Sequence, residues 1–148
     1  TPATKAAVGF LANAGALDLD GLRIDCQTSF ATITATSLDG QPLRRAQRIL
    51  ITSVGRAENT AQGFWPPTEQ QLRWTPVAWM LPGEGRPPVI AEPIQATVRL
   101  DVAGPAAVYS LDSTGKRQAR LNVAGDSGTV QFNPAQADSI WCEVVVED

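Results

Sequence analysis

Three of the four tryptophans in this chain lie in one short stretch, GFWPPTEQQLRWTPVAWM, which runs from Gly63 to Met80. Trp65, Trp74 and Trp79 are interspersed there with three prolines, and proline interrupts helices and central strands alike. An indole has a flat apolar face and one polar N–H, so it can stack on the flat C–H face of a β-linked glucose ring. The stretch therefore predicts a proline-stiffened loop whose tryptophans form a preorganised track for a polysaccharide.

Polar side chains near the tryptophans are candidates for hydrogen bonds to the sugar hydroxyls. The predicted binding residues are Trp65, Trp74, Trp79, Asn59, Gln70, Gln71 and Arg73. A structural interpretation stays open, because a long loop needs a small core and Trp74 shares a face with Leu72 if QLRWT is a short strand. The fourth tryptophan, Trp141, also has two interpretations, since it is either exposed on its strand or covered by the loop.

The sequence contains no histidine, which excludes Ser-His-Asp and Cys-His catalysis and every histidine-ligated metal. It also lacks a G-x-S-x-G motif, a Walker loop and a dinucleotide-binding fingerprint. A carboxylate pair could still hydrolyse a glycosidic bond. The candidates near the tryptophans are Glu58, Glu69, Glu84 and Glu92. Surface or structural carboxylates are the simpler interpretation of each, so we predict that the chain is not an enzyme and has no catalytic residues.

Acidic and sulfur side chains give two further candidate sites. Asp18, Asp20 and Asp25 would suit calcium, which prefers hard oxygen ligands. Their spacing is equally typical of the solvent-facing side of a strand, and we favour that interpretation, so no cofactor or metal is predicted. Cys26 and Cys142 are too far apart in the sequence for a CxxC-type zinc site. They are either a disulfide joining the two ends of the fold or two small buried hydrophobic residues.

The composition indicates one folded domain and narrows the range of partners. The 148 residues are 43% hydrophobic and 18% charged, which is typical of a globular protein, and we predict a single domain over residues 1–148. The net charge is -3 and the densest basic cluster is only Arg44, Arg45 and Arg48, so no nucleic-acid partner is predicted. No apolar run is long enough for a membrane helix, so no membrane partner is predicted. Because the chain begins with Thr1 rather than methionine, we expect it to be part of a longer protein.

Alternation of apolar and polar residues predicts strands along most of the chain. In IQATVRLD (94–101) the apolar residues occupy every second position, and in SIWCEVVVE (139–147) Cys142 lies on the face opposite Trp141 and Glu143. Further strands are predicted at 4–11, 17–25, 30–38, 48–54, 88–92, 106–111, 117–123 and 129–132.

Turn sequences separate these strands at Asp39-Gly40, at DSTG (112–115) and at AGDSG (124–128). The one helical candidate, residues 62–73, is interrupted by its prolines, and residues 56–88 form the longest loop-like region. Many short strands with frequent turns predict an all-β fold, an antiparallel β-sandwich of jelly-roll-like type with a long Trp/Pro-rich loop region.

Three segments resemble the C-terminal β-sandwich of large secreted bacterial glycoside hydrolases: RILITSVGRAENTAQGFW (48–65), WMLPGEGRPPVIAEPIQATVRL (79–100) and AAVYSLDSTGKR (106–117). In those domains a strand ending in a GRAENT-like motif precedes a tryptophan-bearing loop, and a tryptophan, a glycine-rich turn and another strand follow. The resemblance covers most of the chain in order, starting at SFATITATSLDGQPL. Trp65 and Trp79 fall where the pattern carries aromatic residues, whereas Trp74 has no counterpart.

The resemblance implies a non-catalytic carbohydrate-binding module from a bacterial endoglucanase. Among such modules, the chain is similar to carbohydrate-binding module family 81. Members of that family are associated with β-glucan and xyloglucan. The expected partners are thus a β-glucan polysaccharide or oligosaccharide and a catalytic glycoside hydrolase domain in the same secreted parent chain. The alternative is a structural accessory β-sandwich that packs on a catalytic domain without binding sugar.

Overall fold

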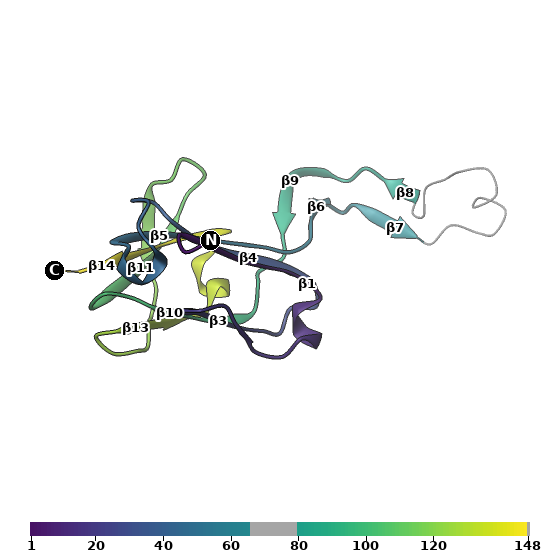
Figure 1. Ribbon diagram of the computed structural model, residues 1–148. Coiled ribbons are helices and arrows are strands. Elements are labelled where there is room, and N and C mark those ends of the chain that lie inside the picture. The colour runs from purple at the N-terminus through teal and green to yellow at the C-terminus, as the bar shows by residue number, and fades with distance from the viewer. Residues whose placement is uncertain (66–79, 148) are drawn as a thin grey trace. The chain divides into compact units, whose positions relative to one another are not determined.

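The computed structural model describes residues 1–65 and 80–147 (Figure 1). The chain divides into two compact units. We call the larger unit, Thr1–Arg56 with Glu92–Asp148, the sandwich, and the smaller unit, Ala57–Ala91, the arm. Every strand pair among the described residues is antiparallel, and none of these residues lies in an α-helix, so the predicted all-β fold is confirmed.

The larger sheet of the sandwich has six strands in the order β1-β4-β5-β14-β11-β12. Their bounds are β1 (Thr4–Gly9), β4 (Ala31–Ser37), β5 (Arg48–Val54), β14 (Trp141–Val146), β11 (Ala106–Leu111) and β12 (Arg117–Arg120). Strands β5 and β14 lie at the centre of the sheet. This position explains why RILITSV is apolar on both faces: Ile49 and Ile51 are buried in the core, and Leu50 is half-buried on the outer face.

The smaller sheet has four strands in the order β13-β10-β3-β2. Their bounds are β13 (Thr129–Phe132), β10 (Ala96–Asp101), β3 (Leu22–Cys26) and β2 (Leu17–Asp18). The sequence predicted a single strand over 17–25, and this is wrong, because the segment folds back on itself as a hairpin. Asp20 and Gly21 both have positive φ, 56° and 93°, which is the backbone geometry that Asp-Gly favours in a tight hairpin turn.

A single hydrophobic core lies between the two sheets of the sandwich, which Figure 1 shows as two layers. Its fully buried members include Leu22, Ile24, Val98 and Leu100 from the smaller sheet and Ile33, Ile49, Ile51 and Val144 from the larger. Each such side chain contributes about 1.5–3 kcal/mol relative to an exposed one. Because strand residues alternate between faces, the residues next to these project from the outer faces of the sandwich. The sandwich architecture is therefore as predicted, while its jelly-roll detail stays a prediction.

Three short 3-10 helices belong to the sandwich: η1 (Leu11–Asn13), η2 (Leu43–Arg45) and η3 (Pro134–Ala137). Of these, η2 connects β4 with β5 and lies close to β10 of the other sheet. Leu43 is buried in the core and anchors η2, whereas the following Arg44 is exposed. A basic side chain is thus held at the edge of the smaller sheet by an apolar anchor.

The two cysteines lie in different sheets, Cys26 on β3 and Cys142 on β14. Both are buried free thiols, so the structure shows them as two small core residues rather than as a disulfide. Burial raises the pKa of both thiols, and that of Cys142 reaches about 12.

The described residues of the arm form two antiparallel strand pairs. Strand β6 (Ala57–Thr60) pairs with β9 (Arg86–Ala91), and β7 (Gly63–Trp65) pairs with β8 (Met80–Gly83). The sequence interpretation of 56–88 as loop-like is therefore wrong at β6, β7, β8 and the start of β9, and residues 66–79 lie outside the described residues. No residue of β6 is buried, so no apolar alternation marks this strand in the sequence, whereas β9 overlaps the strand predicted at 88–92.

Candidate functional site

Most of the predicted binding residues lie outside the described residues, namely Trp74, Trp79, Gln70, Gln71 and Arg73. Trp65 is the last residue of β7, where its backbone lies opposite Met80. Asn59 lies on β6 of the arm. The tryptophan track therefore stays a prediction, and Asn59 is the member of the set whose side-chain contacts are described.

The side chain of Asn59 is engaged within the arm. Its Nδ2 donates a hydrogen bond to the carbonyl of Glu84 at 2.8 Å, and its backbone N–H donates to Oε1 of Gln62 at 2.9 Å. A Cβ at Gly85, whose φ is +71°, would lie 2.7 Å from the Cβ of Asn59, so the turn before β9 needs a glycine there. Asn59 thus holds the two sides of the arm together.

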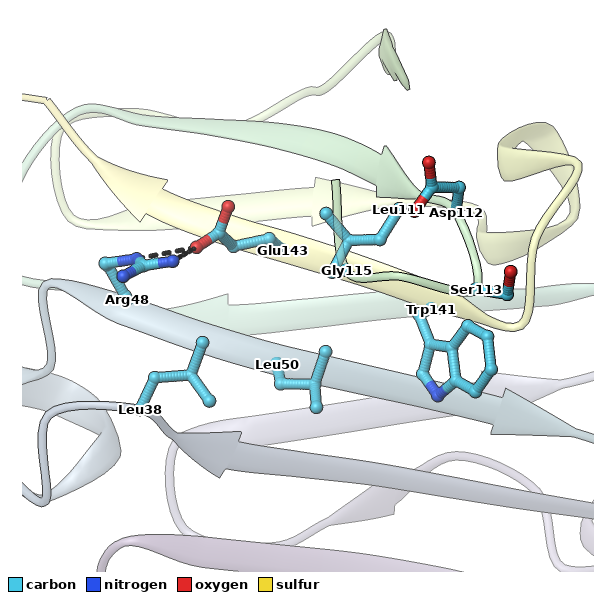
Figure 2. A pocket seen from close by; sticks show the side chains of 9 residues that line it. All are labelled: Leu38, Arg48, Leu50, Leu111, Asp112, Ser113, Gly115, Trp141 and Glu143. Carbon is cyan, nitrogen blue, oxygen red and sulfur yellow. Dashed lines mark hydrogen bonds and ion pairs between the residues drawn. The ribbon is translucent and has the colours of Figure 1, made fainter. Parts of the chain in front are cut away.

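An open hollow of about 290 Å³ lies on the outer face of the six-stranded sheet (Figure 2). Its lining residues are Leu38, Arg48, Leu50, Leu111, Asp112, Ser113, Gly115, Trp141 and Glu143. In Figure 2 the indole of Trp141 lies at one end, the ion pair of Arg48 and Glu143 lies toward the other, and Leu50 lies between them. The hollow combines one aromatic face, aliphatic side chains and charged groups.

The strand register places these side chains. Glu143 on β14 lies opposite Leu50 on β5 and opposite Tyr109 on β11. Trp141, two residues before Glu143, projects from the same face and is half-buried. Its backbone N–H donates to Oγ of Ser139 at 3.1 Å, and that hydroxyl donates to the carbonyl of Leu111 at 2.5 Å. These bonds fix the start of β14 against the end of β11, and with it the position of the indole.

Glu143 is 2% exposed although it projects from the outer face of the sheet. Two arginines cover it: Nε of Arg48 donates to Oε1 at 2.6 Å, and Nε of Arg117 donates to Oε2 at 2.6 Å. The guanidinium of Arg117 also lies over the ring of Tyr109, 4.8 Å from its centroid. Burial alone would raise the pKa of Glu143, but the hydrogen bonds and charges of the two arginines outweigh burial and lower this pKa. The carboxylate is therefore charged and fixed at neutral pH.

The turn after β11 forms another wall of the hollow. Oδ1 of Asp112 accepts hydrogen bonds from the hydroxyl and the backbone N–H of Thr114, at 2.6 and 2.8 Å, and from the N–H of Lys116 at 3.0 Å. These bonds lower the pKa of Asp112 below its usual value, and the bond from the hydroxyl of Thr114 has the largest effect. Because the carboxylate organises its own turn, the wall next to Trp141 is rigid.

Such a hollow suits a ligand with a flat apolar face and polar edges, because the indole can stack on the face while fixed polar groups contact the edges. A sugar ring has this shape. The sequence drew attention to Trp141 but not to Leu38 or Leu50. The available signal was RILITSV, whose apolar residues on both faces place Leu50 on the outer side of a central strand.

The acidic residues considered for calcium have other contacts. Asp20 forms ion pairs with Arg44 at 3.2 Å and with Lys5 at 3.7 Å. Asp25 accepts a hydrogen bond from the side chain of Gln27 at 3.2 Å. Within residues 1–65 and 80–147, no three acidic or cysteine side chains form a group that could hold a metal ion.

Searches against protein-family models, curated proteins and solved structures gave no match to this chain. The described residues include no helix with the length and apolar character needed to cross a membrane. The interpretation of the site consequently depends on its own residues and their geometry.

Proposed function

We propose that the chain is a non-catalytic carbohydrate-binding module that binds β-glucan chains, namely cello-oligosaccharides, β-1,4-glucan and xyloglucan. The observation that carries this proposal is the half-buried indole of Trp141 at the edge of an open, partly aliphatic hollow. In a secreted parent chain, such a module would keep a linked glycoside hydrolase close to its plant polysaccharide. The resemblance to carbohydrate-binding module family 81 points the same way.

The hollow is large enough for one stacked sugar ring rather than for a long chain. One aromatic platform contributes roughly 1–2 kcal/mol, by analogy with aromatic pairs and their buried area. Binding of cellohexaose at a Kd on the order of 10–100 μM corresponds to about -5.5 to -7 kcal/mol. Other platforms must supply the remainder, and Trp65, Trp74 and Trp79 are the predicted ones.

Native affinity electrophoresis against soluble polysaccharides, followed by calorimetric titration with cellohexaose, tests the proposal. We expect retardation on a β-glucan or on xyloglucan, and a loss of about tenfold in affinity for Trp141→Ala. Because the indole is half-buried, a moderate fall in melting temperature should accompany this loss. Phe10→Ala is the matched control, because Phe10 is an aromatic residue with 67% exposure that does not line the hollow.

The same titration locates the binding site. A loss of affinity in Trp65→Ala and Trp79→Ala, with unchanged binding by Trp141→Ala, would keep the function and move the site to the tryptophan-rich stretch. Absence of retardation on every polysaccharide tested would reject the function itself.

The second candidate function, a structural sandwich that packs on a catalytic domain, is favoured by another observation. Val8, Phe10 and Phe30 are 63%, 67% and 48% exposed on the sandwich, and the two phenylalanine rings meet edge to face with centroids 5.3 Å apart. Exposed apolar groups of this kind are typical of interfaces. A chain that binds no polysaccharide, and whose solubility rises when Phe10 and Phe30 are replaced by serine, would favour this function.

A further inference from the structure

A second hollow, of about 220 Å³, lies on the outer face of the four-stranded sheet. Its lining includes Asp18, Gly21, Arg23, Arg44, Arg99 and Asp101. Three of these residues are cations and two are carboxylates. Asp20 also pairs with Arg44, so the charges around the hollow balance, and an anion would have to bind at particular guanidinium groups.

Arg23 and Arg99 lie directly opposite each other on β3 and β10. Each is flanked along its strand by core residues, so both side chains project from the outer face. Directly opposed Cβ atoms are about 4.5–5.5 Å apart, and like charges at such positions destabilise a sheet. Asp18, opposite Arg23 on β2, offsets part of this repulsion, and an anion between the two guanidinium groups would offset more of it.

The carboxylates near these arginines leave them available. Among the described residues, no ion pair involves Arg23 or Arg99. Asp18 is the register partner of Arg23 on β2, and its Oδ1 accepts the backbone N–H of Asp20 at 3.2 Å. Asp126 has a lowered pKa, chiefly because the N–H of Gly128 donates to it, and the charge of Arg99 adds a smaller effect.

Arg44 is held in place at the wall of the same hollow. Its Nη2 forms ion pairs with Asp20 and Asp101, both at 3.2 Å. Gly21 allows this position, because its φ is +93° and a Cβ there would lie 2.8 Å from Nε of Arg44. The third guanidinium is thus fixed by the hairpin turn between β2 and β3 and does not depend on a ligand for its position.

We propose that this hollow binds an oxyanion group, the carboxylate or sulfate ester of an acidic glycan, between Arg23 and Arg99. A guanidinium presents parallel N–H donors that match two oxygens of such a group, so two opposed arginines can grip one oxyanion from both sides. Arg44, whose charge is offset by Asp20 and Asp101, forms a wall of the site without direct coordination. The choice of a glycan rests on the proposed carbohydrate-binding function, whereas the oxyanion site itself lies on the other sheet and takes a charged ligand.

Thermal melts and calorimetric titration of the whole chain test this site at constant ionic strength, with chloride as the reference anion. The probes are sodium sulfate, oligogalacturonate and sulfated dextran oligosaccharide, with neutral cellohexaose for comparison. We expect the two anionic glycans to raise the melting temperature, with Kd values on the order of 1 mM or below. A response to inorganic sulfate without any response to either glycan would overturn the glycan assignment.

Single variants separate the site from general charge effects. Arg23→Gln and Arg99→Gln are each expected to weaken anion binding at least fivefold, and Arg99→Lys less, because lysine keeps the charge but loses the planar donors. Arg120→Gln is the matched control, since Arg120 is an exposed arginine of the larger sheet that forms an ion pair with Glu147 at 3.4 Å and lies outside the hollow. Equal losses in Arg120→Gln and Arg99→Gln would overturn the proposal.

A measurement without any ligand gives an independent check. Removal of one of two opposed like charges should raise the melting temperature of Arg99→Gln by roughly 1–2 °C at low salt, and added chloride should abolish the gain. A lower melting temperature for Arg99→Gln at low salt would show that the favourable effect of Arg99 on Asp126 outweighs the repulsion between the two arginines, and it would remove the argument from repulsion.

Discussion

The sandwich and the arm contain the same kind of antiparallel strands but are stabilised by different interactions. In the sandwich, alternate residues of both sheets are buried in one core. In the arm, no residue with a described side chain is buried, and the strands are held by backbone pairing and by polar contacts such as that from Oγ1 of Thr60 to the carbonyl of Pro88, 2.8 Å. Pairing without burial contributes little stability in water. The free energy of unfolding therefore resides in the sandwich, and the following predictions test this difference.

The largest effect is expected from the core. Ile51 lies on the central strand β5 and is fully buried, so Ile51→Ala removes apolar contacts and leaves a cavity. We expect a loss of about 3–4 kcal/mol in the free energy of unfolding, measured by urea denaturation. Val89→Ala in the arm is the control, because Val89 is 66% exposed, and its effect should stay below about 0.5 kcal/mol. Similar losses in the two variants would mean that the arm shares the stability of the core.

The next effect concerns the buried carboxylate of the sandwich. Glu143→Gln removes the charge between Arg48 and Arg117 and leaves two guanidinium groups next to each other. The arginine side chains are about half exposed, so solvent screens part of the effect, and we expect a loss of about 2 kcal/mol. Glu84→Gln, at an exposed position of the arm, should leave the melting temperature unchanged. An unchanged melt for Glu143→Gln would show that the ion-pair group is not structural.

The dependence of stability on pH should also originate in the sandwich. The pKa values of Asp39, Asp112 and Asp126 lie below the usual 3.8, because neighbouring hydroxyl and backbone N–H groups donate hydrogen bonds to them. A carboxyl group with a lower pKa in the folded state stabilises the fold above its unfolded pKa, and this stabilisation is lost as the pH falls through the folded pKa. Melting temperatures should therefore be steady near neutral pH and fall below about pH 4. Asp39→Asn should flatten that fall, and an unaltered profile would contradict this assignment.

The smallest global effect is expected from the arm itself. Asn59→Ala removes the bond to the carbonyl of Glu84 and should change the free energy of unfolding by less than about 0.5 kcal/mol. Locally, however, amide hydrogen exchange in β6 and β9 should become faster, because a strand pair without a buried face has few other contacts. Hydrogen-exchange mass spectrometry, together with a thermal melt, separates these outcomes. A large drop in melting temperature without faster exchange in the arm would reverse our interpretation of the two regions.

The same physical difference decided which parts of the fold could be predicted from the sequence. Strands β10 and β14 were predicted because their buried faces leave an alternating pattern of apolar residues. Strand β6 leaves no such pattern, since cross-strand bonds hold it and its side chains are not buried, so the sequence suggested a loop. The hairpin at Asp20-Gly21 was missed although two signals were present: Asp-Gly itself, and a change of phase in the apolar alternation from Leu17 and Leu19 to Leu22 and Ile24.

The sequence predicted which kind of side chain would form the candidate site better than it predicted where in the fold the site would lie. Aromatic residues were expected to be the binding platforms, but Trp141 was left open between an exposed position and one covered by the loop, and it was not among the predicted binding residues. The burial of Glu143 could not be predicted, because it depends on Arg48 and Arg117, which are brought to it from two other strands by the sheet register. The opposition of Arg23 and Arg99 likewise could not be predicted, because it depends on the register between β3 and β10.

Each sheet of the sandwich contains one buried thiol, and the rate at which that thiol is labelled measures how often the fold opens around it. A thiol reacts with alkylating or disulfide reagents as the thiolate, and burial both raises the pKa of Cys142 to about 12 and blocks access to it. Labelling therefore requires that the chain open around the cysteine first. Cys26 reports on the smaller sheet and Cys142 on the larger. The ratio of their labelling rates therefore tells whether both sheets open to solvent together or one opens before the other.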